Sequence, residues 1–383
     1  MALHFERDEY AARLGRLTAR MREEKLGAVL LFAQESMYWL TGYDTFGYCF
    51  FQCLVVKADG SMTLLTRAAD LRQARHTSTI DNVVVWVDRM NADSTSDLKN
   101  LMSDMDLLGE RIGVEYDTHG MTGRIARLLD HQLAAFGTIV DASYLVSSLR
   151  LIKSPAEIAH VERAQALADD ALEAALPKIT AGAGEADILA ALQGTILAGG
   201  GDYPANEFVI GSGADALLCR YKSGRRRLEA QDQLTLEWAG VSAHYHAAMM
   251  RTVVIGEATH RHRELFNAGL ETMQVIETVL RSGHTFGEVF DTQARILEER
   301  GLTRHRLNMC GYSLGARFSP SWMEHQMFQT GNTEEIVPDM TLFAHCIIMD
   351  SDSGTAMMLG QTYLTTEGAP RALSRHGLEF LNR

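Results

Sequence analysis

The spacing of apolar residues predicts alternating helices and strands over the first 150 residues. The longest pattern, at residues 6–26, repeats at helical intervals and predicts a surface helix packed on a sheet. Asp59 and Gly60 separate two apolar runs, and this pair supplies the positive φ angles that a hairpin turn requires. The predicted strands are 28–32, 50–56, 62–66, 83–87 and 111–115, the predicted helices are 6–26, 96–105 and 121–136, and 37–43 fits a helix or an extended segment. Such alternation is typical of an α/β domain.

The order of predicted helices and strands changes in the rest of the chain, and we place the domain boundary between residues 152 and 153. Ser154 and Pro155 predict the capped start of a long helix, with Glu157 near its N-terminal end. The predicted helices are 155–176, 185–197, 261–281 and 287–299, and the predicted strands are 208–211, 234–239, 249–255, 341–349 and 361–366. Helices packed on one face of an antiparallel sheet form an α+β domain. A chain of 383 residues is long enough for these two domains, 1–152 and 153–383.

Charge and composition narrow the classes of partner. The net charge is -13, whereas nucleic-acid binding requires clustered positive charge to neutralise phosphates. The sequence has neither an apolar run long enough to span a membrane nor the apolar stretch of a secretory signal near its start. Five scattered cysteines make a poor disulfide framework. We therefore expect a cytoplasmic protein that binds a small molecule, with no nucleic-acid or membrane partner.

Four segments, in their order along the chain, carry a family resemblance. They are 37–43 (MYWLTGY), 150–158 (RLIKSPAEI), Arg251-Thr252 at the end of a predicted strand, and 311–315 (GYSLG). Together they resemble landmarks of the superfamily of creatinase, prolidase and methionine aminopeptidase. This resemblance implies an α/β N-terminal domain followed by an α+β catalytic domain with the pita-bread fold. It also implies a homodimer, in which Tyr43 and Asp44 contribute to the partner's pocket, although this aromatic run equally fits a buried core.

The resemblance also locates the positions that bind metal in the peptidases of this superfamily, which hold two ions with two Asp, one His and two Glu. The corresponding residues in this chain are Glu237, Ala248, Tyr312, His345 and Gly360. A histidine that the peptidases use for proton transfer corresponds to Arg220. Two divalent ions need several anionic oxygen ligands, and Glu237 is the one carboxylate in this set. We therefore expect no catalytic metal and no cofactor.

The segment 311–315 and the segment after it also resemble a smaller group within this superfamily. The sequence 320–325 (PSWMEH), together with 40–44 (LTGYD), is similar to the pattern of ectoine hydrolases. These are metal-free members that open a cyclic amidine by hydrolysing a C–N bond, apparently through an active-site carboxylate. The residues agree with this chemistry, because a buried carboxylate pairs with a cationic amidinium and then attacks it or activates water.

The candidate site combines carboxylate, imidazole, phenol and guanidinium groups. Glu237 and His246 are expected on neighbouring strands, and strand alternation predicts that His244 and His246 share a face. An imidazole titrates near neutral pH and moves protons both ways. The candidate catalytic residues are Glu237, His246, Tyr312, Glu324 and His325. The candidate substrate-binding residues are Arg220, His244, Tyr245, Arg251, Trp322 and His345, with Tyr43 and Asp44 as above.

Structural roles are open for several of these residues. His244 and His246 also fit a structural hydrogen-bonded pair, and Arg251 fits a structural role that the superfamily retains. Trp322 is a candidate for cation–π contact with a delocalised cation. The expected activity is metal-independent hydrolysis of a C–N bond in a small zwitterion, with ectoine as the first substrate to test. The alternatives are a creatinase-like amidinohydrolase, a non-enzymatic binding protein and a residual Xaa-Pro dipeptidase.

Overall fold

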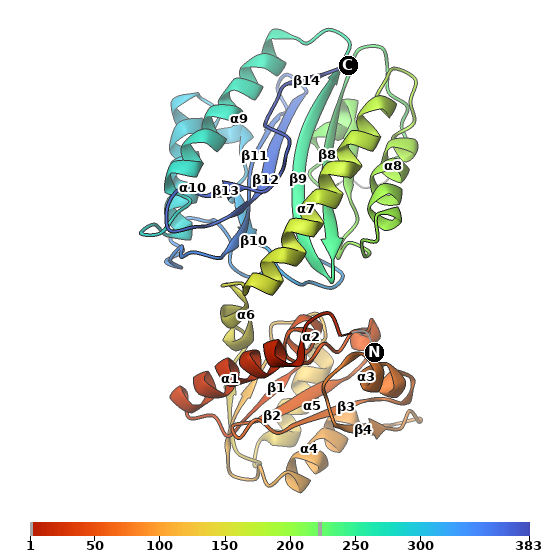
Figure 1. Cartoon of the computed structure of the whole chain (residues 1–383), viewed down its shortest axis with the longest axis vertical. Helices are drawn as coiled ribbons and strands as arrows, with labels where there is room; N and C mark the ends of the chain where they lie inside the picture. The colour runs from red at the N-terminus through yellow and green to blue at the C-terminus, as the bar shows by residue number, and fades with distance from the viewer. Residues whose placement is uncertain (1–2, 221–223) are drawn as a thin grey trace. The chain divides into compact units, whose positions relative to one another are not determined.

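A computed structural model describes residues 3–220 and 224–383. The chain divides into two compact units, Met1–Arg150 and Leu151–Arg383 (Figure 1). The division falls after Arg150 rather than after residue 152 as predicted, because the helix α6 (Leu145–Arg150) ends the first unit and Ile152 forms a β-bridge with Met340 of the second. No helix in the described part of the chain has the length and apolar content that crossing a membrane requires.

The first unit is an α/β domain built on one mixed sheet. In the residues described, the strand order is β4-β3-β2-β1-β5-β6, and β1 has an antiparallel neighbour, β2, and a parallel one, β5. The strands are β1 (Ala28–Leu31), β2 (Cys53–Lys57), β3 (Met62–Arg67), β4 (Asn82–Trp86), β5 (Arg111–Val114) and β6 (Thr138–Asp141). The helices are α1 (Arg7–Glu23), α2 (Gln34–Thr41), α3 (Leu71–Thr77), α4 (Ser94–Asp104) and α5 (Gly123–Leu133), besides α6. Alternate residues of β1 enter two separate apolar clusters, so this sheet is covered on both faces.

The second unit is an α+β domain whose sheet is antiparallel except for the parallel pair of β14 and β9. Within the described ranges the strand order is β10-β11-β12-β9-β8-β7, with β13 beside β12 and β14 beside β9. The strands are β7 (Val209–Ser212), β8 (Asp232–Ser242), β9 (Tyr245–Ile255), β10 (Gly311–Ser313), β11 (Thr341–Asp350), β12 (Thr355–Leu364), β13 (Arg371–Ala372) and β14 (Leu381–Asn382). The helices are α7 (Pro155–Ala175), α8 (Glu185–Ala198), α9 (His260–Val279) and α10 (Phe286–Glu299). Helix α7 packs against β8 and β9, and α9 packs against β11 and β12 (Figure 1).

Two local predictions from the sequence are confirmed. Strands β2 and β3 form the expected hairpin, and Gly60 in its turn has φ +91°, whereas Asp59 does not have the positive φ that was predicted for it. Helix α7 begins with a capping box, in which the Ser154 hydroxyl accepts from the Glu157 N–H and the Glu157 carboxylate accepts from the Ser154 N–H.

The hairpin of β8 and β9 is longer than the sequence predicted. The strands meet at a two-residue turn, Ala243-His244, in which both residues have positive φ, 50° and 63°. This conformation matches the twist of the two strands. Gly240, just beyond the predicted strand 234–239, lies inside β8 and allows close helix packing, since a Cβ at this position would lie 1.8 Å from the Ala164 carbonyl oxygen of α7.

Candidate active site

One face of the second sheet collects all five positions that correspond to metal ligands in the superfamily. Paired residues share a face of an antiparallel sheet, and side chains alternate along each strand. Glu237 pairs with Met250, Met250 with Gly360, Gly360 with His345, and Tyr312 with Phe343. Ala248 lies on the same face because it is two residues from Met250. The five residues therefore share one face of the sheet.

A cavity of about 280 Å³ opens on this face. Four of the predicted site residues line it: Glu237, Tyr312, Arg220 and Trp322. The other lining residues are Asn206, Glu207, Val209, Pro320, Ser321 and Met323. The cavity thus joins three strands of the sheet, β7, β8 and β10, to three loops, and it combines two carboxylates, a phenol and a guanidinium.

A chain of hydrogen bonds fixes one oxygen of the Glu237 carboxylate. The Trp322 indole N–H donates to the Tyr312 hydroxyl oxygen at 2.9 Å, and the Tyr312 O–H donates to Glu237 Oε1 at 3.3 Å. The Trp322 ring itself is fully buried, and its backbone N–H donates to Asn206 Oδ1 at 3.0 Å. Trp322 therefore acts in this structure as a hydrogen-bond donor that orients the phenol, rather than as the cation–π surface expected from the sequence.

The environment of Glu237 raises the pKa of its carboxyl group. Burial raises the pKa of Glu237 from 4.5 to about 7, against the opposing effects of the Arg220 charge and the Tyr312 hydrogen bond. Burial and the neighbouring Glu237 charge raise the pKa of Tyr312 well above its ordinary value, so the phenol stays protonated and remains a donor. A carboxyl group whose pKa lies near the working pH is suited to general acid–base catalysis.

Two predicted histidines lie on the cavity side of the sheet but do not line the cavity. His246 is fully buried beside the Trp322 ring, and its Nε2 accepts the Ala205 N–H at 2.9 Å. His345 is 3% exposed, with its ring 6.2 Å from Tyr312. Burial lowers the pKa of each imidazole to about 3, so both are neutral at physiological pH. The prediction that His246 acts on substrate inside the same pocket as Glu237 is corrected by this placement.

The prediction that His244 and His246 share a face of one strand was wrong. His244 lies in the turn between β8 and β9 with φ 63°, so strand alternation does not apply to it. Its ring stacks on Phe318 at 4.2 Å between centroids, and its backbone N–H donates to Asp202 Oδ2 at 3.2 Å. His244 is not among the residues that line the cavity.

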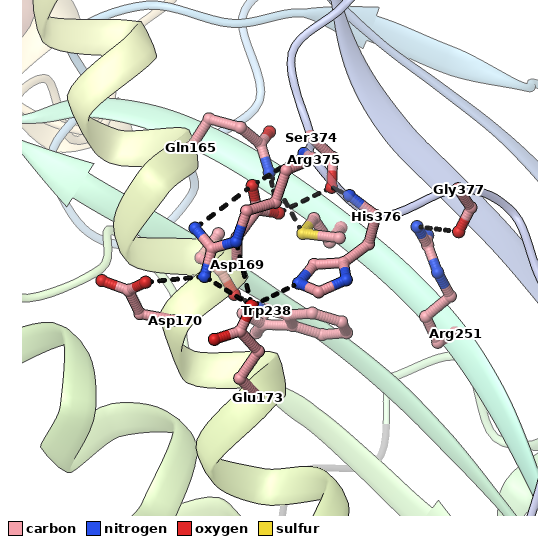
Figure 2. A network of polar contacts seen from close by, with 12 residues as sticks. Gln165, Asp169, Asp170, Glu173, Trp238, Arg251, Ser374, Arg375, His376 and Gly377 are labelled. Atoms are coloured by element: carbon pink, nitrogen blue, oxygen red, sulfur yellow. Dashed lines mark hydrogen bonds and ion pairs between the residues drawn. The ribbon is translucent and has the colours of Figure 1, made fainter.

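The structure also corrects the predictions for Tyr245 and Arg251, which lie on the helix-covered face of the sheet. The Tyr245 hydroxyl donates to Glu157 of α7 at 2.7 Å. The Arg251 guanidinium donates to the backbone carbonyls of Met250, Gly360 and Gly377, and Figure 2 shows the last of these contacts. Burial lowers the pKa of Arg251 to about 10. Both residues are an odd number of positions from Ala248, so strand alternation turns them away from the cavity.

Four further predicted residues lie outside the cavity lining. The Glu324 carboxylate is buried and forms an ion pair with Arg317 at 3.5 Å, and the neighbouring His325 is half-buried. In the first unit, Tyr43 is fully buried, and its hydroxyl donates to Gln52 at 3.1 Å, which corrects its predicted role in binding substrate. Asp44 is half-buried, and its backbone N–H donates to Thr77 Oγ1.

The residues at the five ligand positions do not fit a dinuclear metal centre. Ala248 and Gly360 offer no donor atom, and the space beside Gly360 is filled. A Cβ added to Gly360 would lie 2.8 Å from the Phe343 ring, 3.0 Å from His345 Cβ and 3.2 Å from Met250 Cβ. Neighbouring side chains thus occupy the space that a Cβ at this position would enter.

Among residues 3–220 and 224–383, one group of three potential metal ligands, His305, Asp350 and Asp352, lies outside the cavity lining. These carboxylates already contact arginines: Asp350 accepts from Arg261, and Asp352 forms an ion pair with Arg304. This cluster is therefore accounted for as a set of ion pairs.

The loop residues Asn206 and Glu207 line the cavity but were not among the predicted site residues. Asn206 and Glu207 belong to no motif, and they reach the cavity because the segment before β7 packs against the loop that carries Trp322. No periodic signal marks such a contact, since it joins segments more than a hundred residues apart.

The comparisons with known proteins agree with this architecture. Residues 159–367 match Metallopeptidase family M24, and residues 13–152 match the Creatinase/Prolidase N-terminal domain. The chain is 26% identical over 366 residues to "Ectoine hydrolase" of Halomonas elongata, covering 89% of each chain. It is 27% identical over 171 residues to the Xaa-Pro dipeptidase of Pyrococcus furiosus, covering 45% of this chain and 49% of that enzyme.

Solved structures share the fold at lower sequence identity. The X-Pro aminopeptidase of Thermotoga maritima superposes with a TM-score of 0.84 at 18% identity, covering 97% of this chain and 99% of that one. The dipeptidase PepE of Mycobacterium ulcerans superposes with a TM-score of 0.85 at 20% identity, covering 99% of both chains. With its N-terminal creatinase/prolidase domain and its pita-bread catalytic domain, this chain belongs to metallopeptidase family M24.

Proposed function

We propose that this chain is a metal-independent hydrolase that cleaves a C–N bond in a small zwitterionic nitrogen compound, with ectoine as the first substrate to test. One observation carries the proposal. Glu237 lies in a cavity with a pKa of about 7, and it takes the place of a metal ligand in a set that does not fit two ions. The reactive group of the site is then the carboxylate itself.

The charges of the cavity favour a zwitterion. Glu237 attracts a cationic amidinium, and Arg220 at the exposed side of the cavity offers a bidentate fork to a carboxylate. A cavity of about 280 Å³ is at the small end of the range for ligand sites, roughly 300–1,000 Å³. A small cyclic amino acid fits this combination better than an extended peptide.

The geometry supports a short reaction sequence. The Glu237 carboxylate takes a proton from water, and the water oxygen bonds to the amidinium carbon. The same proton then passes to the ring nitrogen as its C–N bond breaks, which opens the ring and restores the carboxylate. The hydroxyl group left on the carbon becomes the amide carbonyl, and its remaining proton passes to the released amine, which leaves as an ammonium. Tyr312 keeps its proton and holds Oε1 in place, while the other oxygen faces the substrate. Direct attack of Glu237 on the same carbon is the second route, and mass spectrometry of a trapped reaction separates the two by the covalent adduct.

The cavity lining weighs against a creatinase-like reaction that uses histidine as acid and base, since its described residues include no histidine. The similarity to a protein named ectoine hydrolase covers 89% of the chain, whereas that to the Pyrococcus furiosus dipeptidase covers 45%. We include a cytoplasmic location and a homodimer in the proposal.

Product formation from ectoine, hydroxyectoine, creatine and an Xaa-Pro dipeptide, each with and without chelator, tests this function. We expect turnover of one of the two cyclic amidines, unchanged by chelator, together with loss of turnover in Glu237→Gln. Elemental analysis of the purified protein provides a second measurement. Two bound metal ions per chain, or turnover of the dipeptide that chelator abolishes, would refute the proposal.

A further inference from the structure

Arg220 reaches the cavity from a segment that is not a strand of the sheet. It lies just beyond the 3-10 helix η4 (Gly213–Leu217), which follows β7, and it is exposed. The position of its guanidinium relative to Glu237 therefore depends on the contacts that hold this segment. We define the Arg220 segment as Gly213–Arg220.

A buried carboxylate holds two points of the chain that flank this segment. Glu185, the first residue of α8, is fully buried. Its Oε1 accepts the Ser212 N–H at 2.8 Å and the Ser212 hydroxyl at 2.6 Å, and its Oε2 accepts the Arg226 N–H at 2.9 Å. Ser212 precedes the Arg220 segment and Arg226 follows it. One side chain therefore ties together the two flanks of this part of the chain.

Arg226 strengthens the same junction. Its guanidinium donates to the Ser212 hydroxyl at 2.8 Å and forms an ion pair with Asp232, the first residue of β8. It also lies against Gly213, where a Cβ would be 3.0 to 3.2 Å from the guanidinium atoms. Gly213 has φ +58°, a conformation that glycine adopts without strain. The start of the Arg220 segment is thus fixed by close packing as well as by hydrogen bonds.

Two side chains of β8 form hydrogen bonds to the backbone of the Arg220 segment. The Thr235 hydroxyl donates to the Ala216 carbonyl at 3.1 Å, and the Gln233 amide donates to the Gly213 carbonyl at 3.0 Å. Thr235 is two residues before Glu237 and shares its face of the sheet. The strand that carries the carboxylate therefore also positions the segment that carries the guanidinium.

We infer that Glu185 is a positioning residue that, through the Ser212–Arg226 junction, sets the place of Arg220 and thereby the affinity for the carboxylate of the substrate. This inference rests on the proposed function only where substrate binding is concerned. The order of the Arg220 segment is measurable without any substrate. The ligand class that Arg220 would bind is a zwitterion with a carboxylate group.

The test compares Glu185→Gln with a matched control, Asp169→Asn. Asp169 is also buried and also joins two segments, because it accepts from the Ser374 hydroxyl at 2.6 Å and from the Arg375 N–H at 3.0 Å (Figure 2). It lies on α7, on the opposite side of the sheet from the cavity. Each variant replaces a buried carboxylate by an amide, which leaves fewer acceptor sites for the same donors.

Hydrogen–deuterium exchange is the first measurement, made on the full chain without substrate. We expect faster exchange at Ser212–Arg220 in Glu185→Gln than in the wild type, and no change there in Asp169→Asn. Should Glu185→Gln fail to fold, Ser212→Ala removes the hydroxyl but keeps the backbone N–H, and the same local increase is expected. Unchanged exchange in this segment, or an equal change in the control, would overturn the inference.

Steady-state kinetics is the second measurement. We expect Glu185→Gln to raise KM about tenfold with kcat within twofold of wild type, since weakening a hydrogen bond to a charged group has an effect of about this size. In an Arg220→Met background the same substitution should change KM less than twofold, because the two residues act through one contact. A full tenfold effect in that background would refute the coupling. If Glu237→Gln keeps full activity, the proposed function fails, whereas the exchange result still decides the role of Glu185.

Discussion

Replacing Glu237 by glutamine should make the folded protein more stable at alkaline pH while removing its activity. The folded state raises the pKa of Glu237 from 4.5 to about 7, so it binds this proton more tightly than the unfolded chain does. Between these two values, stability falls as the pH rises, and above about pH 7 the full penalty is present. A neutral glutamine carries no such penalty, and its amide oxygen still accepts from Tyr312.

The expected gain in stability follows from the pKa shift of Glu237. Each pKa unit corresponds to about 1.4 kcal/mol, and water in the cavity screens part of the effect, which leaves about 2 kcal/mol at pH 8. For a domain of this size, that corresponds to a melting temperature about 5 °C higher than that of wild type at pH 8. At pH 5 the two proteins should melt within about 1 °C of each other. Activity should fall by about 10²–10⁴-fold, the usual contribution of a general base.

Differential scanning calorimetry at pH 5 and pH 8 measures this difference, and Asp169→Asn serves as the control because its carboxylate is buried outside the cavity. The control should be less stable than wild type at both pH values, because it loses acceptors for its hydrogen bonds. A melting temperature for Glu237→Gln that is equal to or below that of wild type at pH 8 would refute the argument that burial raises the pKa of Glu237.

Three further predictions follow from the site and its surroundings. The value of kcat/KM should rise with pH through about 7, where Glu237 loses its proton. Arg220→Met should move the midpoint of this pH profile upward, since the guanidinium charge lowers the pKa of Glu237. An unchanged midpoint would contradict this prediction. Gly360→Glu should lower stability by about 2 kcal/mol, because the Phe343 ring must move, and elemental analysis should find no metal gained. Tyr43→Phe should leave kcat/KM within twofold and reduce the unfolding free energy by about 1 kcal/mol, since its buried hydroxyl bonds within the first unit.

Several features followed from local sequence patterns. The Asp59-Gly60 turn and the Ser154 cap depend on residues within a few positions of one another, and both were predicted. Arg251, by contrast, was predicted to bind substrate, although it lies three positions from Ala248 and strand alternation turns it away from the cavity.

Other features were decided by contacts between distant segments. His244 lies in a turn rather than in a strand. Trp322 is a hydrogen-bond donor because folding brings it against Asn206 from a loop and Tyr312 from β10. The raised pKa of Glu237 likewise reflects burial among segments that are far apart in sequence. The sequence by itself determined the family and the class of each of the two domains, because periodicity and motifs are local properties. The tertiary structure alone decided which side chains share the cavity, since burial and charge depend on residues that only folding brings together.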